Sequence, residues 1–206
     1  MCGRFSLDTL PDTLARHFDL REAPALQPRG NIAPSQDIAV IRLPGQDREC
    51  VLLRWGLVPA WSKEPKTRYS TINARAETVA EKPAYRNAFR RRRCLIPATG
   101  FYEWQQAGNR KIPHHIRRKD RGLFAFAGLW ERWEQGADAL ESCTIIVTTA
   151  NRLLAPIHAR MPVILEPDRY REWLDPQSID TAALRSLLVP CAADSLEAYP
   201  VSQPGN

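Results

Sequence analysis

The second half of the chain consists of short apolar runs separated by turn-forming residues. Thr-Gly, Gly-Asn-Arg and Lys-Asp-Arg-Gly segments divide these runs between residues 98 and 123, and such residues are typical of tight turns. The runs are as short as strands usually are, and too short for most helices. The pattern predicts strands at residues 93–98, 101–105, 112–117, 123–130, 142–149 and 161–165.

The first half mixes helical and turn patterns. Leu10, Leu14 and Phe18 recur every four positions, which predicts a short amphipathic helix after Asp8. A Pro-Gly-Gln-Asp segment predicts a hairpin formed by residues 38–43 and 49–54. Residues 21–35 and 55–61 contain Pro and Gly and predict loops. Further helices are predicted at residues 74–81, 83–91, 151–157, 167–174 and 180–187.

Hairpins therefore dominate over regular strand–helix–strand repeats, which favours an antiparallel-rich α+β fold. We see no linker, internal repeat or low-complexity block in the 206 residues, so we expect one domain over residues 1–206. The apolar runs are too short to cross a bilayer, and the first residues lack the apolar core of a signal peptide. We expect a cytoplasmic protein.

The charge balance is basic, with 29 Lys and Arg against 23 Asp and Glu. Arg accounts for 24 of the 29 basic residues, and its planar fork binds phosphate in two places. Partners that carry phosphate are therefore plausible. A GC-rich genome would explain the Arg excess equally well, because a phosphate-binding surface requires clustering rather than a high total.

Five cysteines lie at positions 2, 50, 94, 143 and 191. An odd number without a C-x-x-C motif argues against a disulfide framework and against a zinc site. We expect neither a metal nor a cofactor. Cys50, Cys94 and Cys143 begin apolar runs and are expected to pack in strands. Cys2 differs from them, since the sequence provides no apolar core around it.

Cys2 can carry unusual chemistry if Met1 is removed. Aminopeptidases remove Met when the second residue is small, which would leave Cys2 with a free α-amine. That amine has a pKa of about 7.8, against about 10.4 for Lys, and is neutral far more often at pH 7. An aldehyde captured by the amine as a Schiff base can then be closed by the thiol into a five-membered thiazolidine. The alternative is that Cys2 merely follows the start codon.

Two further polar residues stand out. Asn73 precedes a predicted helix and could cap it, with Glu77 in the first turn and Arg75 near a terminus where phosphate also binds. Glu103 lies between Tyr102 and Trp104 in an apolar strand. There it is a candidate for a raised pKa and for proton transfer, or else a solvent-exposed residue of an edge strand.

Arg90 to Arg93 form the strongest basic cluster in the sequence. Such a run usually marks a solvated helix end. With Trp55, Trp61 and Tyr69 as stacking surfaces, it could instead follow a nucleic-acid backbone. His158 lies on a predicted loop, where it could serve acid–base chemistry or form a local hydrogen bond.

Eight short blocks give a more specific indication. They are MCGRF at 1–5, NIAP at 31–34, WGLVP at 55–59, NARAE at 73–77, RCLIPA at 93–98, GFYEW at 100–104, AGLW at 127–130 and HARMP at 158–162. Together they closely resemble the SRAP family of abasic-site-processing proteins. The resemblance extends from residue 1 to about residue 165, with a weaker match at 199–202. It implies a mixed β-sheet or barrel-like core with flanking helices.

The resemblance also implies roles for particular residues. The family binds single-stranded DNA and captures abasic sites as covalent crosslinks. Cys2 matches the crosslinking residue, Asn73 the residue that orients its amine, Glu103 the catalytic carboxylate and His158 a histidine near the sugar. The residues that match DNA-binding positions are Arg4, Arg75 and Arg160 for phosphates, and Trp61 with Pro34 for separating bases. To these we add Arg90 and Arg93 from the basic cluster.

Two other functions remain open at this point. One is a peptidase with Cys2 as nucleophile and His158 as base; the resemblance also implies self-removal of the residue before Cys2. The other is a non-catalytic protein that binds single-stranded DNA and in which Cys2 is incidental. In each case we expect a monomer that does not associate with membranes.

Overall fold

The computed structural model describes residues 2–67, 70–135 and 137–204. Its strands are β1 (Arg4–Leu7), β2 (Arg29–Ile32), β3 (Asp37–Arg42), β4 (Glu49–Trp55), β5 (Asn73–Arg75), β6 (Arg93–Ala98), β7 (Gly100–Ala107), β8 (Arg110–Arg118), β9 (Phe124–Gln135), β10 (Asp138–Thr149), β11 (Arg160–Pro162), β12 (Ile164–Leu165) and β13 (Leu196–Pro200). Its α-helices are α1 (Pro11–Phe18), α2 (Arg86–Arg91), α3 (Tyr170–Leu174) and α4 (Thr181–Ser186), and the short 3₁₀ turns η1 (Pro167–Arg169) and η2 (Ala193–Ser195) complete it.

The core of the fold is a closed ring of strands. β10 pairs with β4, β4 with β3, β3 with β6, β6 with β9, and β9 returns to β10. β10 runs parallel to β4 and β5, and the other strand pairs in the described part of the chain are antiparallel. This ring confirms the antiparallel-rich α+β fold with a barrel-like core and flanking helices.

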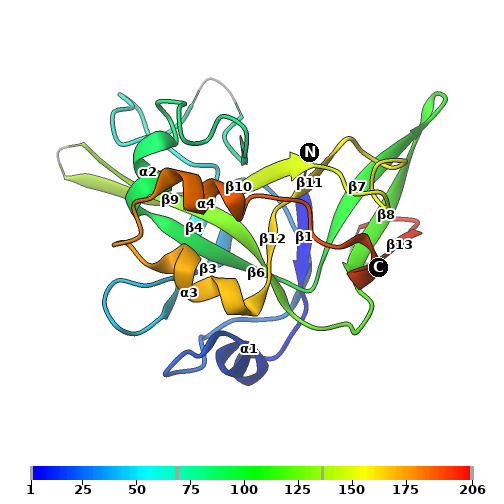
Figure 1. The fold of residues 1–206 in the computed structure, drawn as a ribbon, viewed down its shortest axis with the longest axis horizontal. Helices are drawn as coiled ribbons and strands as arrows, with labels where there is room; N and C mark the ends of the chain where they lie inside the picture. Colours follow the sequence, from blue (N-terminus) through cyan, green and yellow to red (C-terminus); the bar gives the residue numbers. More distant parts are fainter. Residues whose placement is uncertain (1, 68–69, 136, 205–206) are drawn as a thin grey trace.

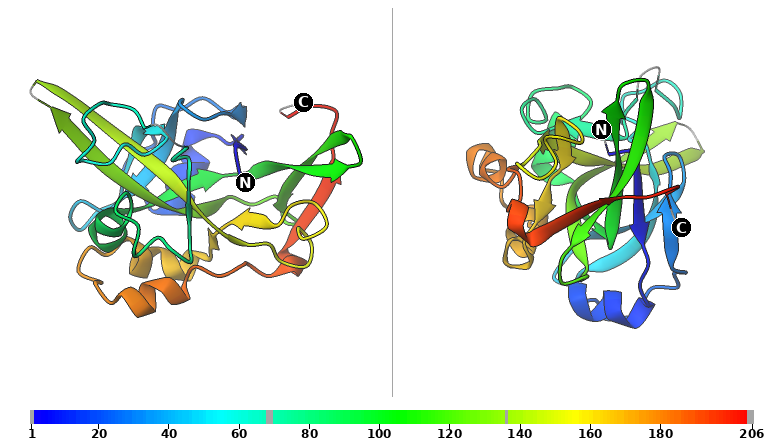
Figure 2. Two further views of the ribbon diagram at one scale, coloured as in Figure 1. Left: turned by 90° about the horizontal axis from the view of Figure 1, so that it is seen from above. Right: turned by 90° about the vertical axis from the view of Figure 1, so that its right-hand side faces the viewer.

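A second sheet, in the order β13-β8-β7-β1-β2, lies beside the barrel. Its β7–β8 hairpin extends toward one end of the molecule, while the β9–β10 hairpin extends toward the other (Figures 1 and 2). β6 continues almost directly into β7 through Thr99, so the barrel and the second sheet share one polypeptide path. Buried apolar side chains from both sheets form one hydrophobic cluster.

The short helices cover the barrel. α3 and α4 lie on one side of it and α1 lies at its lower end in the view of Figure 1. α1 begins with Pro11 at a position where the missing N–H costs nothing, and it ends at Asp19, which has a left-handed backbone with a φ of 54°. Leu14 and Phe18 are buried as predicted, but Leu10 is 67% exposed because it precedes the helix.

The predicted strands and the hairpin are present, but four other predictions need correction. Residues 74–81 are not a helix, since Asn73–Arg75 form β5 beside β10 and turns follow. The predicted helix 83–91 is limited to α2. Residues 151–157 form successive turns, and the loop predicted at 21–35 contains β2. In each case hydrogen bonds to a neighbouring segment or local turns override the local sequence preference.

Candidate functional site

Cys2 lies two residues before the start of β1 and is completely buried. Its Sγ lies 4.0 Å from the carbonyl oxygen of Arg4. Burial, with a further contribution from the charge of Glu103, raises the pKa of this thiol well above its usual value. The expectation that no core surrounds Cys2 was therefore wrong, because Cys2 belongs to the main hydrophobic cluster of buried residues. At neutral pH the thiol is protonated rather than a thiolate.

Glu103 lies on β7, in the interior of the second sheet rather than at its edge. β7 pairs with β1 through Arg4 and Tyr102 and with β8 on its other side. Strand alternation turns Glu103 away from the Tyr102 face, and only 2% of Glu103 is exposed. Burial raises the pKa of this carboxyl, although the nearby charge of His158 acts in the opposite direction. The burial and the raised pKa agree with the first of the two alternatives for Glu103 and exclude a solvent-exposed residue of an edge strand, while its role in proton transfer stays a prediction.

His158 follows the turns of residues 152–157 and precedes β11. Its Nδ1 lies 3.0 Å from the backbone nitrogen of Arg160 and 3.1 Å from the carbonyl oxygen of the same residue, so it accepts from the N–H when it carries no proton and donates to the carbonyl when it does. Either bond to Arg160 holds the ring in place, and in its protonated form the ring is close enough to Glu103 to lower the pKa of that carboxyl. The local hydrogen bond and the position near an acid–base group are thus both present, and they do not exclude one another.

Asn73 begins β5, whose residues pair in parallel with Ile145, Ile146 and Val147 of β10. The helix-capping alternative was wrong because no helix follows. The side-chain Nδ2 donates a hydrogen bond of 3.0 Å to the carbonyl of Ile72. The Oδ1 atom is buried and has no hydrogen-bond partner within the described residues. Such an acceptor costs about 1–3 kcal/mol, so it is available for a donor that enters the site.

Asn73 also lines a cavity of about 620 Å³. Trp61 and Arg75, two residues predicted to bind DNA, line the same cavity. Trp61 is 60% exposed, and its Nε1 donates a hydrogen bond of 3.4 Å to the carbonyl of Pro83. The sequence analysis missed Tyr85, which lines the cavity and donates a hydrogen bond of 3.3 Å to the backbone oxygen of Asn73. An aromatic residue following the basic and proline residues at 82 and 83 was a weak signal for it.

Three of the predicted phosphate-binding arginines lie near these residues. Arg4 donates a hydrogen bond of 3.0 Å to Oδ1 of Asn31, a residue of the NIAP block to which the sequence analysis gave no role. Arg75 is exposed at the end of β5. Arg160 forms an ion pair with Glu77. All three guanidinium groups lie at the protein surface or partly exposed, where an anion can reach them.

Pro34 and Arg90 are placed differently. Pro34 lies half-buried in the turn between β2 and β3, and Arg90 is exposed on α2. No contact described above joins either residue to the group around Cys2.

Two of the residues predicted to contact DNA are buried, and a third lies outside the described residues. Arg93 is only 3% exposed, and its guanidinium donates to the carbonyls of Phe89, Arg90, Trp173, Asp175 and Ser178. It therefore joins the ends of α2 and α3 and was wrongly assigned to DNA. Trp55 is fully buried, with its Nε1 donating to the carbonyl of Ile72, so it cannot stack on bases. Tyr69, like Met1, lies outside the described residues.

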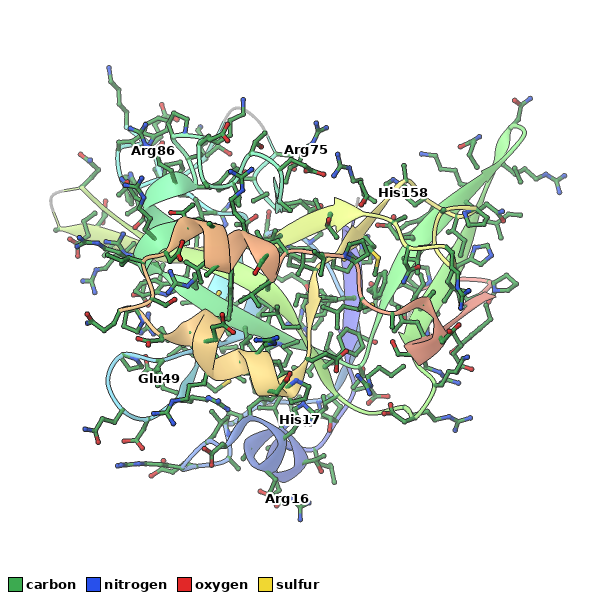
Figure 3. All side chains as sticks on the ribbon, in the orientation of Figure 1. Arg16, His17, Glu49, Arg75, Arg86 and His158 are labelled. Atoms are coloured by element: carbon green, nitrogen blue, oxygen red, sulfur yellow. The ribbon has the colours of Figure 1, made fainter. Side chains whose placement is uncertain are left out.

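The remaining residues form one connected group. The charge of Glu103 raises the pKa of the Cys2 thiol, Glu103 lies near His158, and His158 bonds to Arg160. Arg160 in turn pairs with Glu77, which lies in the turn just after β5, the strand that contains Asn73 and Arg75. In Figure 3, Arg75 and His158 lie on the same upper side of the molecule, opposite α1. The group combines a protonated thiol, a buried carboxyl and cations for an anionic ligand.

The described ranges also bear on metal binding and on membrane insertion. No cluster of three potential metal ligands was found there. No helix in those ranges combines the length and apolar character needed to span a bilayer.

Comparisons with known proteins agree with this arrangement. The family model described as SOS response associated peptidase (SRAP) matches residues 1–205. The abasic site processing protein YoaM of Bacillus subtilis is 47% identical, covering 98% of this chain and 91% of that protein. The abasic site processing protein HMCES of Xenopus tropicalis is 29% identical over 98% of this chain and 73% of its own length.

Solved structures give the same result for the fold. A crystal structure of a protein from Bacteroides thetaiotaomicron superposes with a TM-score of 0.90 at 28% identity, covering 100% of this chain and 97% of that one. A protein from Bordetella bronchiseptica gives a TM-score of 0.86, covering 98% and 100% of the two chains. With a family model that spans nearly every residue and relatives that match along almost the whole length, this chain belongs to the SRAP family.

Proposed function

We propose that this protein binds single-stranded DNA and captures abasic sites as a covalent thiazolidine crosslink through the amine and thiol of Cys2. The observation that carries the proposal is the burial of Cys2, just before β1, close enough to the buried Glu103 for the charge of that carboxyl to raise the pKa of the thiol. The names of curated relatives, which are described as abasic site processing proteins, support it.

The chemistry requires that Met1 be removed, so that Cys2 carries the free amine. The amine nitrogen attacks the C1′ aldehyde of the ring-opened deoxyribose, and the resulting carbinolamine loses water to give a Schiff base. The Sγ atom then adds to the imine carbon, and the thiol proton passes to the nitrogen as the five-membered ring closes. A thiol that stays protonated until this step suits the sequence, because it supplies the proton that the nitrogen gains.

The surrounding residues would divide the remaining tasks. The buried Oδ1 of Asn73 would accept a hydrogen bond from the Cys2 amine and aim its lone pair. Glu103, with its raised pKa, would donate a proton to the departing hydroxyl and assist opening of the sugar ring. His158 would contact the sugar and its 3′ phosphate.

Other residues would bind the DNA around the lesion. Arg4, Arg75 and Arg160 would contact phosphates, and exposed Arg90 would extend this path. Trp61 and Pro34 would separate the bases beside the lesion, where one stacking partner is already missing. With this substrate, the protein would act as a monomer in the cytoplasm, at the nucleoid when bound.

Two further activities belong to the proposal. The Schiff base offers a route to strand cleavage by a lyase reaction, and peptide-bond cleavage is confined to self-removal of Met1, in keeping with the family description as a peptidase. A general peptidase is disfavoured, because the buried Cys2 thiol has a raised pKa whereas a cysteine peptidase needs a thiolate.

The test is intact mass spectrometry before and after incubation with a single-stranded abasic oligonucleotide. The purified protein should be lighter than the full sequence by one methionine, and incubation should add the mass of the oligonucleotide less one water. Cys2→Ala should lose the stable adduct but form a product when borohydride reduces the imine. Cys50→Ala is the matched control, since Cys50 lies on β4. An undiminished stable adduct in Cys2→Ala would refute the proposal.

A further inference from the structure

Glu77 places a negative charge between two arginines that we assign to DNA phosphates. Its Oε1 forms an ion pair with Nη1 of Arg160, which lies 83 residues away in the sequence. Partial burial alone would raise the pKa of Glu77, but its own backbone N–H, Arg160 and Arg75 together lower it below its usual value. Glu77 is therefore a carboxylate at neutral pH and compensates the charge of the guanidinium that should receive DNA.

The strand register produces this contact. β10 lies between β5 and β11, with Val147 paired to Arg75 on one side and Thr149 paired to Arg160 on the other. Both arginines therefore approach the same end of β10. The N–H of Ala76 donates a hydrogen bond of 2.9 Å to the carbonyl of Val147, which directs the chain into Glu77.

Helix α4 fixes the backbone on which Glu77 lies. Nη2 of Arg185 donates a hydrogen bond of 3.2 Å to the carbonyl of Glu77, and Nη1 lies 3.6 Å from the carboxylate of Glu81. The backbone of this turn is thus tied to the far part of the chain. The carboxylate of Glu77 cannot follow Arg160 far if that guanidinium moves to another anion.

We propose that in the free protein the carboxylate of Glu77 occupies the place beside the Arg160 guanidinium where a DNA phosphate binds. When single-stranded DNA binds, one of its backbone phosphates displaces this carboxylate. The exchange is chemically balanced, because the guanidinium fork binds a carboxylate and a phosphate in the same geometry. It is also accessible, since the side chains of Arg160 and Glu77 are 25% and 46% exposed. The inference rests on the proposed function, because it takes Arg160 as a phosphate contact.

Such an exchange would make the affinity for DNA depend on whether the DNA strand reaches Arg160. A DNA strand that contacts the other DNA-binding arginines but does not reach Arg160 leaves the Arg160–Glu77 ion pair intact and gains no binding energy from Arg160. Only a strand that lies deep enough to displace Glu77 gains the contact next to His158, to which Arg160 is hydrogen-bonded. Glu77 would thus lower the affinity for every strand in order to favour those that reach the capture site.

The test measures binding of an unmodified single-stranded oligonucleotide, so that crosslinking does not interfere. Glu77→Gln keeps the size of the side chain and removes its charge. We expect it to bind about three- to tenfold more tightly at low salt, because the phosphate no longer has to displace a carboxylate from Arg160. The matched control is Glu172→Gln, which removes the same charge from the Arg169–Glu172 ion pair on α3.

A double-mutant cycle separates exchange from simple repulsion. In an Arg160→Gln background, Glu77→Gln should change affinity less than twofold, because no guanidinium remains to be released. An equal gain in both backgrounds would overturn the inference, as would weaker binding by Glu77→Gln or an effect no larger than that of Glu172→Gln. If wild-type protein binds no single-stranded DNA at all, the proposed function fails and this inference falls with it.

Discussion

Glu103 has two properties that conflict in a folded protein, since it is an ionisable proton donor and is almost fully buried. Burial favours its neutral form and raises its pKa above the usual value for a glutamate. Its contribution to stability is therefore fully present below pH 4.5 and is lost as the pH rises through the raised pKa of the folded state. At neutral pH the buried Glu103 carboxyl therefore lowers the stability of the fold, although the proposed chemistry needs it.

Glu103→Gln should accordingly increase the melting temperature at pH 8 but not at pH 4, where the wild-type carboxyl is neutral in the folded state and mostly neutral in the unfolded state. The same variant should form the crosslink with an abasic oligonucleotide at least tenfold more slowly, since it has no proton to donate. Thermal unfolding at the two pH values and crosslinking time courses measure these effects. Equal melting-temperature changes at both pH values would show that burial of charge is not the cause.

Arg93 and Arg90 are three positions apart, but substitution of Arg93 should cost much more stability than substitution of Arg90. Arg93 satisfies buried carbonyls at the ends of α2 and α3, where helices leave such groups unpaired. Arg93→Met should lower the free energy of unfolding by about 3 kcal/mol or more, because hydrogen bonds from a charged donor are lost together. Arg90→Met should change it by less than about 0.5 kcal/mol, as expected for an exposed residue. Urea unfolding of both variants tests this, and similar losses would contradict the different placement.

At the scale of elements, sequence patterns succeeded where the decisive contacts are local. The hairpin of β3 and β4 and the strands β6 to β9 were predicted because their turns and their partners are close in the sequence. The helix predicted at residues 74–81 is absent, although its Ala and Glu residues favour a helix. Asn73–Arg75 pair instead with β10, which lies about 70 residues later in the sequence. A partner so distant leaves no trace in the local pattern.

The same limit applies to the site. The family blocks pointed to Cys2 and Glu103, but the sequence could not show that the thiol is buried, because the other members of its hydrophobic cluster come from distant parts of the chain. The run Arg90–Arg93 appeared as one basic cluster. In the structure it crosses from the end of α2 into β6, so that Arg90 points to solvent and Arg93 into the interior. Charge density along a chain does not reveal where a helix ends and a buried strand begins.

Strand β7 provides a prediction at the element scale, since it begins at Gly100 and carries Glu103. A Cβ atom at position 100 would lie 2.2 Å from Nε2 of His115 and 3.0 Å from the carbonyl oxygen of Ile116, so β8 approaches too closely for any side chain. Gly100→Ala should lower the free energy of unfolding by about 1–3 kcal/mol and slow crosslinking by displacing Glu103. Gly45→Ala, where a Cβ atom meets nothing within 4 Å, is the control. Equal stability of the two variants, measured by urea unfolding, would refute the argument.

For the whole molecule, the candidate site combines contributions from both sheets. Cys2 and Glu103 come from the second sheet, whereas Asn73, Arg75 and Arg160 come from strands that pair with β10 of the barrel system. The two sheets therefore need to be assembled before the group exists. A proposed capture reaction that depends on a buried amine and thiol is thus tied to the complete fold rather than to the short segment that carries Cys2.

The net charge of +6 acts on the same scale. Phosphate contacts release counterions without reading bases, so binding of single-stranded DNA should fall linearly in log–log form with salt, by about 0.7 per contact. Arg90→Gln should reduce this slope by about 0.7 and weaken binding about three- to tenfold at low salt, equally for oligonucleotides of different sequence.

Arg21→Gln is the control, since Arg21 pairs with Asp47 and follows α1 at the opposite end of the molecule (Figure 1). Equilibrium titrations by fluorescence anisotropy at several salt concentrations measure both quantities. A loss confined to certain bases would mean that Arg90 reads sequence, and an equal effect of Arg21→Gln would mean that total charge, rather than a path of arginines beside the site, governs binding.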